Sequence, residues 1–203
     1  MKKTILLIPF LVIALASCGS SIDDKTIIVG ASSTPHALIL EQTKDYIKEK
    51  GYTLDIKVMT DYVTPNLSLE SGDLDANYFQ HEPYLNDFNA AYGTDLISVK
   101  KIHFEPLGIY AGKKSNLDDI KPTDKIAIPN DTSNKARAID LLSEHGLEGC
   151  ELIEMEAQSI PTTLSDVEYA VINGNYALSS NVISKVIVTE STESAIANTM
   201  AMD

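Results

Sequence analysis

Short β-branched and apolar runs alternate with stretches of helical spacing along most of the chain. Residues 26–29 form a β-branched run that ends at a glycine, residues 35–50 carry apolar side chains at helical spacing, and residues 52–59 alternate between apolar and polar side chains. These three segments predict a strand, a helix and a second strand. Because a crossover helix joins parallel strands, the pattern predicts a parallel β-α-β unit.

The same order returns in the second half of the chain. Residues 125–129 predict a strand, residues 133–145 a helix and residues 152–155 another strand, and a further strand-to-helix junction follows at residues 169–174. The repeated order predicts an α/β fold. Ligand-binding groups of such folds gather beyond the carboxyl ends of the strands, so polar residues directly after strands are the first candidates for a site.

Aromatic and polar residues crowd the segment from residue 61 to residue 84. A short strand is expected at residues 74–76, with Phe79 and His81 just beyond its end and a helix after them. Any one of these rings could be ordinary core. As a set they indicate a binding surface. The members of this set are Tyr62, Phe79, His81 and Tyr84.

A second candidate site follows the strand predicted at residues 125–129. A helix capped by Thr132 or Ser133 is expected to begin there, so that Asn134 and Arg137 share one helical face. Arg137 is the single arginine among 16 Lys and Arg residues, and a guanidinium binds a carboxylate through two parallel hydrogen bonds. A helix N-terminus also favours anions. The pair therefore predicts a carboxylate-binding site, with a solvated surface arginine as the alternative.

The sequence lacks the patterns that are typical of nucleic-acid binding, of enzymatic sites and of metal centres. The net charge is −13, which disfavours nucleic acid as a partner. The sequence contains no phosphate-binding glycine loop, dinucleotide motif or nucleophile elbow. His81 precedes Glu82, but no second histidine follows four residues later, and His36, His103 and His145 are scattered. We therefore expect neither an enzyme nor a metal centre, and no cofactor.

The N-terminal segment predicts export and attachment to a membrane. Two lysines precede an apolar run of about a dozen residues, whereas a spanning helix needs roughly 20. The run ends in Leu-Ala-Ser-Cys, a pattern that resembles the bacterial lipoprotein cleavage site. We expect residues 1–17 to be a signal peptide, Cys18 to carry the lipid, and residues 18–24 to form a tether. Cys150 then has no disulfide partner.

With these segments in view, the chain resembles the NlpA family of methionine-binding lipoproteins, which deliver D- and L-methionine to an ABC importer. The most specific match runs from Gly72 to Leu85. The resemblance implies a two-lobed periplasmic-binding-protein-like fold of type II, in which the lobes close on the ligand about a hinge. Lobe one would comprise residues 25–107 and about 187–203, and lobe two residues 108–186.

The resemblance also implies the roles of the site residues. The groups around the ligand thioether would be Tyr62, Phe79, His81 and Tyr84, and methionine sulfur packs well against ring edges. Asn134 and Arg137 would hold the ligand carboxylate, and Asn173 would accept the ammonium group. The implied partners are methionine, an ABC permease and the membrane that holds the lipid of Cys18.

The chain departs from the family pattern in three places. The segment between Leu147 and Leu152 is shorter, so lobe two is expected to be reduced. A second shortening after Leu178 places Lys185 where the family has the asparagine of a Ser-Pro-Tyr-x-Asn strand, and a lysine there would repel the ligand ammonium. The chain also stops at Asp203, short of the family pattern, which predicts exposed apolar surface on lobe one.

These departures leave two functions open. A methionine-binding lipoprotein of an ABC importer would bind a free amino acid saturably. An envelope lipoprotein that has lost its ligand would fold without amino-acid affinity. One that has changed its ligand would bind an acid without an amine.

Overall fold

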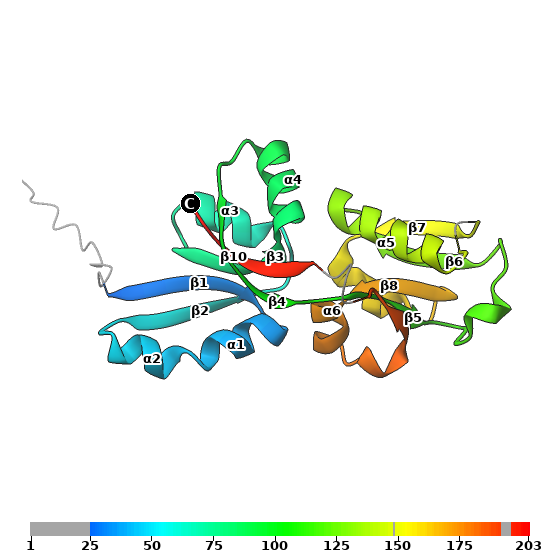
Figure 1. The fold of residues 1–203 in the computed structure, drawn as a ribbon, viewed down its shortest axis with the longest axis horizontal. Coiled ribbons are helices and arrows are strands. Elements are labelled where there is room, and N and C mark those ends of the chain that lie inside the picture. Colours follow the sequence, from blue (N-terminus) through cyan, green and yellow to red (C-terminus); the bar gives the residue numbers. More distant parts are fainter. Residues whose placement is uncertain (1–24, 148, 192–195) are drawn as a thin grey trace, which may run out of the picture.

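Two five-stranded sheets lie side by side, each flanked by helices, and form two lobes (Figure 1). The computed structural model describes residues 25–147, 149–191 and 196–203. The strand order is β2-β1-β3-β10-β4 in lobe one and β7-β6-β8-β5-β9 in lobe two. The two sheets confirm the predicted α/β class and two-lobed architecture. Lobe two was expected to be reduced, but its sheet has as many strands as that of lobe one. The predicted signal peptide and Cys18 lie outside the described residues.

Lobe one is built around the predicted β-α-β unit. Its strands are β1 (Thr26–Ser32), β2 (Thr53–Met59), β3 (Ala76–His81), β4 (Ile97–Phe104) and β10 (Ala197–Met202). Its helical segments are η1 (Ser33–Ala37), α1 (Leu38–Glu41), α2 (Lys44–Glu49), α3 (Thr64–Glu70) and α4 (Glu82–Tyr92). β1 and β2 pair in parallel, as predicted. The helix predicted between them is divided, because the backbone N–H and the hydroxyl of Thr43 both bond to the carbonyl of Leu40, at 2.9 and 2.7 Å.

The strand predicted at residues 74–76 is β3, which begins later and runs on to His81. All six of its residues are buried, since β3 lies between β1 and β10. Polar side chains are tolerated there because they bond to α3. Asn66 and Gln80 exchange two hydrogen bonds, of 2.9 and 2.6 Å. The predicted bounds were therefore wrong, and Phe79 lies inside the strand.

Lobe two contains the second predicted β-α-β unit. Its strands are β5 (Leu107–Ala111), β6 (Lys125–Pro129), β7 (Glu151–Met155), β8 (Tyr169–Asn173) and β9 (Val186–Thr189). Its helical segments are η2 (Leu117–Asp119), α5 (Thr132–Glu144), η3 (Ala157–Thr163), α6 (Gly174–Ser179) and η4 (Ile183–Lys185). β6 pairs in parallel with β7 and with β8. Apolar side chains of β5, β6 and β8 pack against α5 in the core of this lobe.

The N-cap of α5 is Asp131, whereas the sequence predicted Thr132 or Ser133. Asp131 has an extended backbone, and its carboxylate accepts from the N–H of Asn134 at 2.9 Å. Thr132 and Ser133 already belong to the helix. The predicted cap was wrong because the side chain of Asp131 already accepts from the N–H of Asn134, so neither hydroxyl serves as the cap.

Two connections join the lobes and touch each other. β4 passes into β5 through Glu105, and Glu190 directly follows β9, the last strand before β10. The N–H of Glu190 donates to the carbonyl of Leu107 at 2.9 Å, and the N–H of Leu107 donates to the Glu190 carboxylate at 2.8 Å. Because β9 pairs with β5, the return to lobe one begins later than the expected residue 187.

Lobe one exposes apolar side chains along β4, the edge strand of its sheet. The exposed fractions are 57% for Ile97, 50% for Val99, 42% for Ile102 and 68% for Phe104. No helix within the described ranges is long and apolar enough to cross a bilayer.

Candidate ligand site between the lobes

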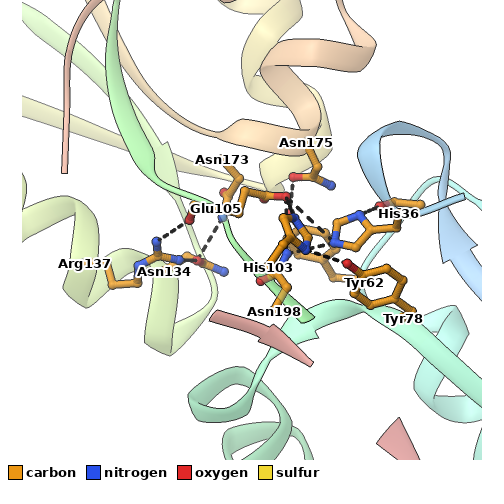
Figure 2. Close-up of polar contacts among 11 residues, drawn as sticks. His36, Tyr62, Tyr78, His103, Glu105, Asn134, Arg137, Asn173, Asn175 and Asn198 are labelled. Carbon is orange, nitrogen blue, oxygen red and sulfur yellow. Dashed lines mark hydrogen bonds and ion pairs between the residues drawn. The ribbon is translucent and has the colours of Figure 1, made fainter. Parts of the chain in front are cut away.

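A narrow cavity lies where β3 and α4 of lobe one face α5 and β8 of lobe two. Nine residues line it: Tyr62, Phe79, Gln80, His81, Tyr84, Glu105, Asn134, Asn173 and Asn198. Six of the seven predicted ligand-binding residues belong to this set. The seventh, Arg137, lies beside it and donates from Nη1 to Oδ1 of Asn134 at 3.0 Å. Residues far apart in the sequence thus meet at one place (Figure 2).

The position of His81 at the end of β3 fixes the partner of each of its ring nitrogens. Its Nδ1 accepts from the N–H of Tyr84 at 3.1 Å, so the side chain caps α4. In a neutral ring this assigns the proton to Nε2, which lies 3.0 Å from Oδ1 of Asn134. Burial, and then the nearby charge of Arg137, lower the pKa of His81 to about 4. Near neutral pH the side chain is therefore an uncharged donor that reaches from lobe one to lobe two.

Three donors converge on one oxygen atom, Oδ1 of Asn134. They are Nε2 of His81 at 3.0 Å, Nη1 of Arg137 at 3.0 Å and Nδ2 of Asn173 at 2.9 Å. An amide oxygen has two lone pairs, so three donors exceed its capacity. A carboxylate oxygen is a stronger acceptor for such groups. The arrangement is suited to binding an anion.

Arg137 is already engaged by a carboxylate of the same chain. Its Nε and Nη2 donate to the two oxygens of Glu190 at 3.0 and 2.6 Å, and Nη2 also reaches the carbonyl of Glu105 at 3.3 Å. The two side chains are 10% and 7% exposed. The two-pronged face that the sequence predicted for a ligand carboxylate therefore binds Glu190. Nη1 carries two hydrogens, of which Asn134 accepts one.

Asn173, at the carboxyl end of β8, leaves an acceptor unused. Its Nδ2 donates to Asn134, whereas its Oδ1 is buried without a hydrogen-bond partner. Buried polar atoms of native proteins nearly always have partners, so an unpaired one calls for an explanation. An acceptor that lines a cavity is suited to a donor supplied by a ligand.

Three residues of this lining were not among the predicted site residues: Gln80, Glu105 and Asn198. Glu105 lies in the connection between β4 and β5, and Asn198 lies at the start of β10. Nδ2 of Asn198 donates to Oε2 of Glu105 at 3.3 Å. Both side chains are buried, with exposed fractions of 9% and 3%. Because a buried carboxylate is costly unless it is paired, this end of the cavity attracts cations.

Asn198 corrects the expectation about Lys185. Lys185 is exposed in η4 and does not line the cavity. The spacing Ser194-Ala-Ile-Ala-Asn198 keeps the serine and the asparagine of the Ser-Pro-Tyr-x-Asn pattern. Matching that pattern to this segment would have identified Asn198 from the sequence. The predicted repulsion between a lysine and the ligand ammonium was wrong.

Aromatic rings form the wall opposite these polar groups. Tyr62 lies 5.6 Å from Phe79, 5.7 Å from Tyr84 and 4.8 Å from Tyr176 between ring centroids. The hydroxyl of Tyr62 donates to Oδ1 of Asn175 in lobe two at 2.7 Å. Burial, followed by Tyr176, raises the pKa of Tyr62, so the hydroxyl stays protonated. Tyr62 therefore joins the lobes as well as lining the cavity.

The free space inside these walls is about 10 Å³, which is room for about one water molecule. A wider cleft of about 270 Å³ shares Tyr62 and Tyr84 with this cavity and is bounded by α4 and by the residues that precede α5. A ligand of amino-acid size does not fit inside the narrow cavity in this arrangement of the lobes.

The family model of the NlpA lipoproteins matches residues 27–203. The membrane lipoprotein TpN32 of Treponema pallidum is 35% identical, over 82% of this chain and 69% of that protein. The methionine-binding lipoprotein MetQ of Bacillus subtilis is 36% identical, over 83% of this chain and 63% of that protein. The chain thus spans about two thirds of the length of these curated relatives.

Solved structures of related proteins have the same fold. A lipoprotein from Ruminococcus gnavus superposes with a TM-score of 0.85 at 42% identity, covering 88% of this chain and 84% of that one. A nutrient-binding protein from Burkholderia cenocepacia, solved with methionine bound, superposes with a TM-score of 0.82 at 34% identity, covering 87% and 84%.

Proposed function

Because this chain belongs to the NlpA lipoprotein family, we propose that it is the solute-binding lipoprotein of an ABC importer. It holds methionine, D or L, between its lobes and presents it to a membrane permease. Lipid on Cys18 attaches it to the extracytoplasmic face of a membrane after residues 1–17 are removed. The observation that carries this proposal is the polarity of the cavity, with converging donors at one end and a buried carboxylate at the other.

The donor end binds the ligand carboxylate in this proposal. His81 and Asn173 each present an N–H that now points at Asn134, and Arg137 adds its Nη1. The two oxygens of a ligand carboxylate that takes the place of Oδ1 of Asn134 have about four lone-pair sites between them, enough to accept from all three donors. Charge-assisted hydrogen bonds of this kind are roughly twice as strong as neutral ones.

The acceptor end binds the ligand ammonium group. Glu105 supplies a buried negative charge, and the unpaired Oδ1 of Asn173 supplies a neutral acceptor. Binding an ammonium group there satisfies both groups at once. An acid that lacks the amine leaves Oδ1 of Asn173 buried and unpaired, which costs about 1–3 kcal/mol, and leaves Glu105 with the neutral amide of Asn198 in place of a charged partner. The amine is therefore a requirement for binding.

The aromatic wall receives the thioether side chain. Tyr62, Phe79 and Tyr84 surround this side of the cavity, with ring centroids 5.6 to 6.1 Å apart. Sulfur makes favourable contacts at about 5 Å from the edges of aromatic rings. Relatives support this choice of ligand, because the Bacillus subtilis protein is named as methionine-binding and the Burkholderia cenocepacia protein was solved with methionine.

A second candidate is an envelope lipoprotein that no longer binds an amino acid. One observation favours it, because Glu190 already occupies the two-pronged face of Arg137. A ligand carboxylate would then depend on one free hydrogen of Nη1 together with neutral donors. This candidate predicts a stably folded chain without affinity for methionine.

A thermal-unfolding panel separates the two candidates. Residues 19–203, which contain every described residue, are unfolded and refolded to remove trapped ligand. They are then heated with L-methionine, D-methionine or 4-methylthiobutanoate, the analogue without the amine. At a ligand concentration of about 100 times Kd, binding adds about 2.7 kcal/mol, which raises Tm by roughly 5–10 °C.

We expect this rise with at least one methionine stereoisomer and none with 4-methylthiobutanoate. A cooperative melt that none of the three compounds shifts would leave the second candidate standing. A shift by the analogue alone would indicate a changed ligand.

A further inference from the structure

Three possible metal ligands from separate elements meet behind the cavity. His36 lies in η1, His103 in β4 and Glu105 in the connection to β5. One ligand atom from each lies within 4.8 Å of the other two (Figure 2). We propose that these three side chains form a binding site for a divalent transition-metal ion of the zinc class. His36 and His103 do not line the ligand cavity, whereas Glu105 does, so the metal site and the proposed methionine site share one carboxylate.

Hydrogen bonds orient both imidazoles for such an ion. Nδ1 of His36 lies 2.5 Å from Oγ of Ser32, and Nδ1 of His103 lies 2.6 Å from Oη of Tyr78. Nε2 of His36 accepts from Asn198 at 2.8 Å, which places the proton of the neutral ring on Nδ1. Histidines that bind metals almost always donate their other N–H to an outer partner in this way.

His103 presents an unused nitrogen to the same place. Its Nε2 is buried without a hydrogen-bond partner and lies 3.6 Å from Oε2 of Glu105. In the tautomer that carries its proton on Nδ1, which Tyr78 then accepts, the lone pair of Nε2 is available. A buried nitrogen without a partner is rare in native proteins. A metal ion would satisfy it together with Glu105.

The two separations from Glu105 favour a metal over an ammonium group. Oε2 of Glu105 lies 3.8 Å from Nε2 of His36 and 3.6 Å from Nε2 of His103. Bonds of 2.0–2.2 Å to zinc place tetrahedral ligands about 3.3–3.6 Å apart. An ammonium group that donates over about 2.8 Å would need acceptors about 4.6 Å apart. The observed separations from Glu105 therefore require only a small contraction around a metal.

The residues around the three ligand atoms supply a carboxylate, bury the site and leave a route by which an ion can enter. His36 is fully buried, and the Glu105 side chain beside it is 9% exposed. His103 is 20% exposed and offers a route of entry. Nδ2 of Asn198 occupies part of the space and must turn away. After that rotation its Oδ1 can serve as a fourth ligand.

Cobalt binding tests this site without any amino acid present, so the result does not depend on the proposed transport function. Residues 19–203 carrying Cys150→Ser, which removes the free thiol, are stripped of metal and titrated with cobalt chloride while visible absorbance is followed. We expect one tetrahedral cobalt ion per chain, displaced by one equivalent of zinc. Absence of saturable cobalt binding would overturn the proposal.

Two further variants separate the site from general histidine binding. His103→Gln should weaken cobalt binding at least ~10-fold, and Tyr78→Phe, which removes an outer partner, should weaken it by about 10–100-fold. His145→Gln is the matched control, because His145 is exposed and lies at the far end of α5. Melting temperatures verify that each variant folds. Equal cobalt affinity in His103→Gln and His145→Gln would contradict the assignment.

Discussion

Arg137 binds Glu190 through both prongs of its guanidinium, from Nε at 3.0 Å and from Nη2 at 2.6 Å. Glu190 also accepts from the backbone N–H of Leu107, and Arg137 reaches the carbonyl of Glu105. One side chain of α5 thus contacts both connections between the lobes. Arg137 therefore has a structural role in the closed arrangement beside its proposed role in ligand binding.

Removal of Glu190 should destabilise the protein strongly. In Glu190→Ala the guanidinium of Arg137, which is 10% exposed, loses its charged partner, and breaking a buried pair in this way costs about 3 kcal/mol. Urea unfolding measures the loss. The control is Glu154→Ala, which breaks the solvent-exposed pair with Lys135 on the same helix and should cost less than about 1 kcal/mol. Similar losses in both variants would show that the Arg137 pair is not a structural link.

Asn198 and Lys185 should differ in their effect on ligand binding. Asn198→Ala removes the buried amide that bonds to Glu105, so we expect methionine affinity to fall about 10-fold or more. Lys185→Ala should change affinity by less than about twofold, because Lys185 is exposed outside the cavity. Calorimetric titration measures both values. Tighter methionine binding in Lys185→Ala would show that Lys185 repels the ligand ammonium group.

Acid should weaken the fold through His81. The pKa of His81 is about 4 in the folded chain, whereas an unperturbed imidazole has a pKa of about 6.5. Between these values the unfolded chain binds a proton that the folded chain does not. Stability from the neutral ring is therefore present above pH 6.5 and is lost as pH falls toward 4, by at most about 1.4 kcal/mol per pH unit.

Urea unfolding between pH 7 and pH 5 tests this dependence. His81→Gln should lose less stability over this range than the unmodified chain. His145→Gln, at an exposed position, should behave like the unmodified chain. An unchanged pH slope in His81→Gln would mean that another group carries the acid sensitivity.

The hydroxyl of Tyr62 should slow the release of ligand. It bonds to Asn175 across the cleft at 2.7 Å, so Tyr62→Phe keeps the ring but removes a bond between the lobes. We expect methionine to dissociate about 3–10-fold faster in stopped-flow experiments. Tyr169→Phe is the control, because the hydroxyl of Tyr169 bonds to Asn116 within lobe two. Equal release rates in the two variants would argue against the contact as a latch.

The sequence predicted the elements whose pattern is local. The strands at 26–29, 125–129 and 152–155 and the helix from residue 133 are all present, because each has apolar periodicity or a β-branched run of its own. The β3 strand was placed too early because Asn77 and Gln80 read as loop residues. Only tertiary contacts with α3 show that these amides are satisfied inside the core.

The site was predicted where the chemistry was local as well. Asn134 and Arg137 are three residues apart on one helix, so their spacing in the sequence was enough to predict that their side chains lie together. The partner of Arg137 was not predictable, since Glu190 is 53 residues away and reaches α5 only because the two connections run together. Glu105 carries no local motif, and its burial follows from its position between the lobes.

The most direct test of the account is the heat of binding of methionine, as the L and as the D stereoisomer, to ligand-stripped residues 19–203, compared with the same titrations of Asn173→Ala. Asn173 gives one donor and one unpaired acceptor to the proposed site. We predict saturation at one methionine per chain and at least ~10-fold weaker binding in the variant. Absence of saturable heat in the unmodified chain, or equal affinity in both proteins, would contradict the account.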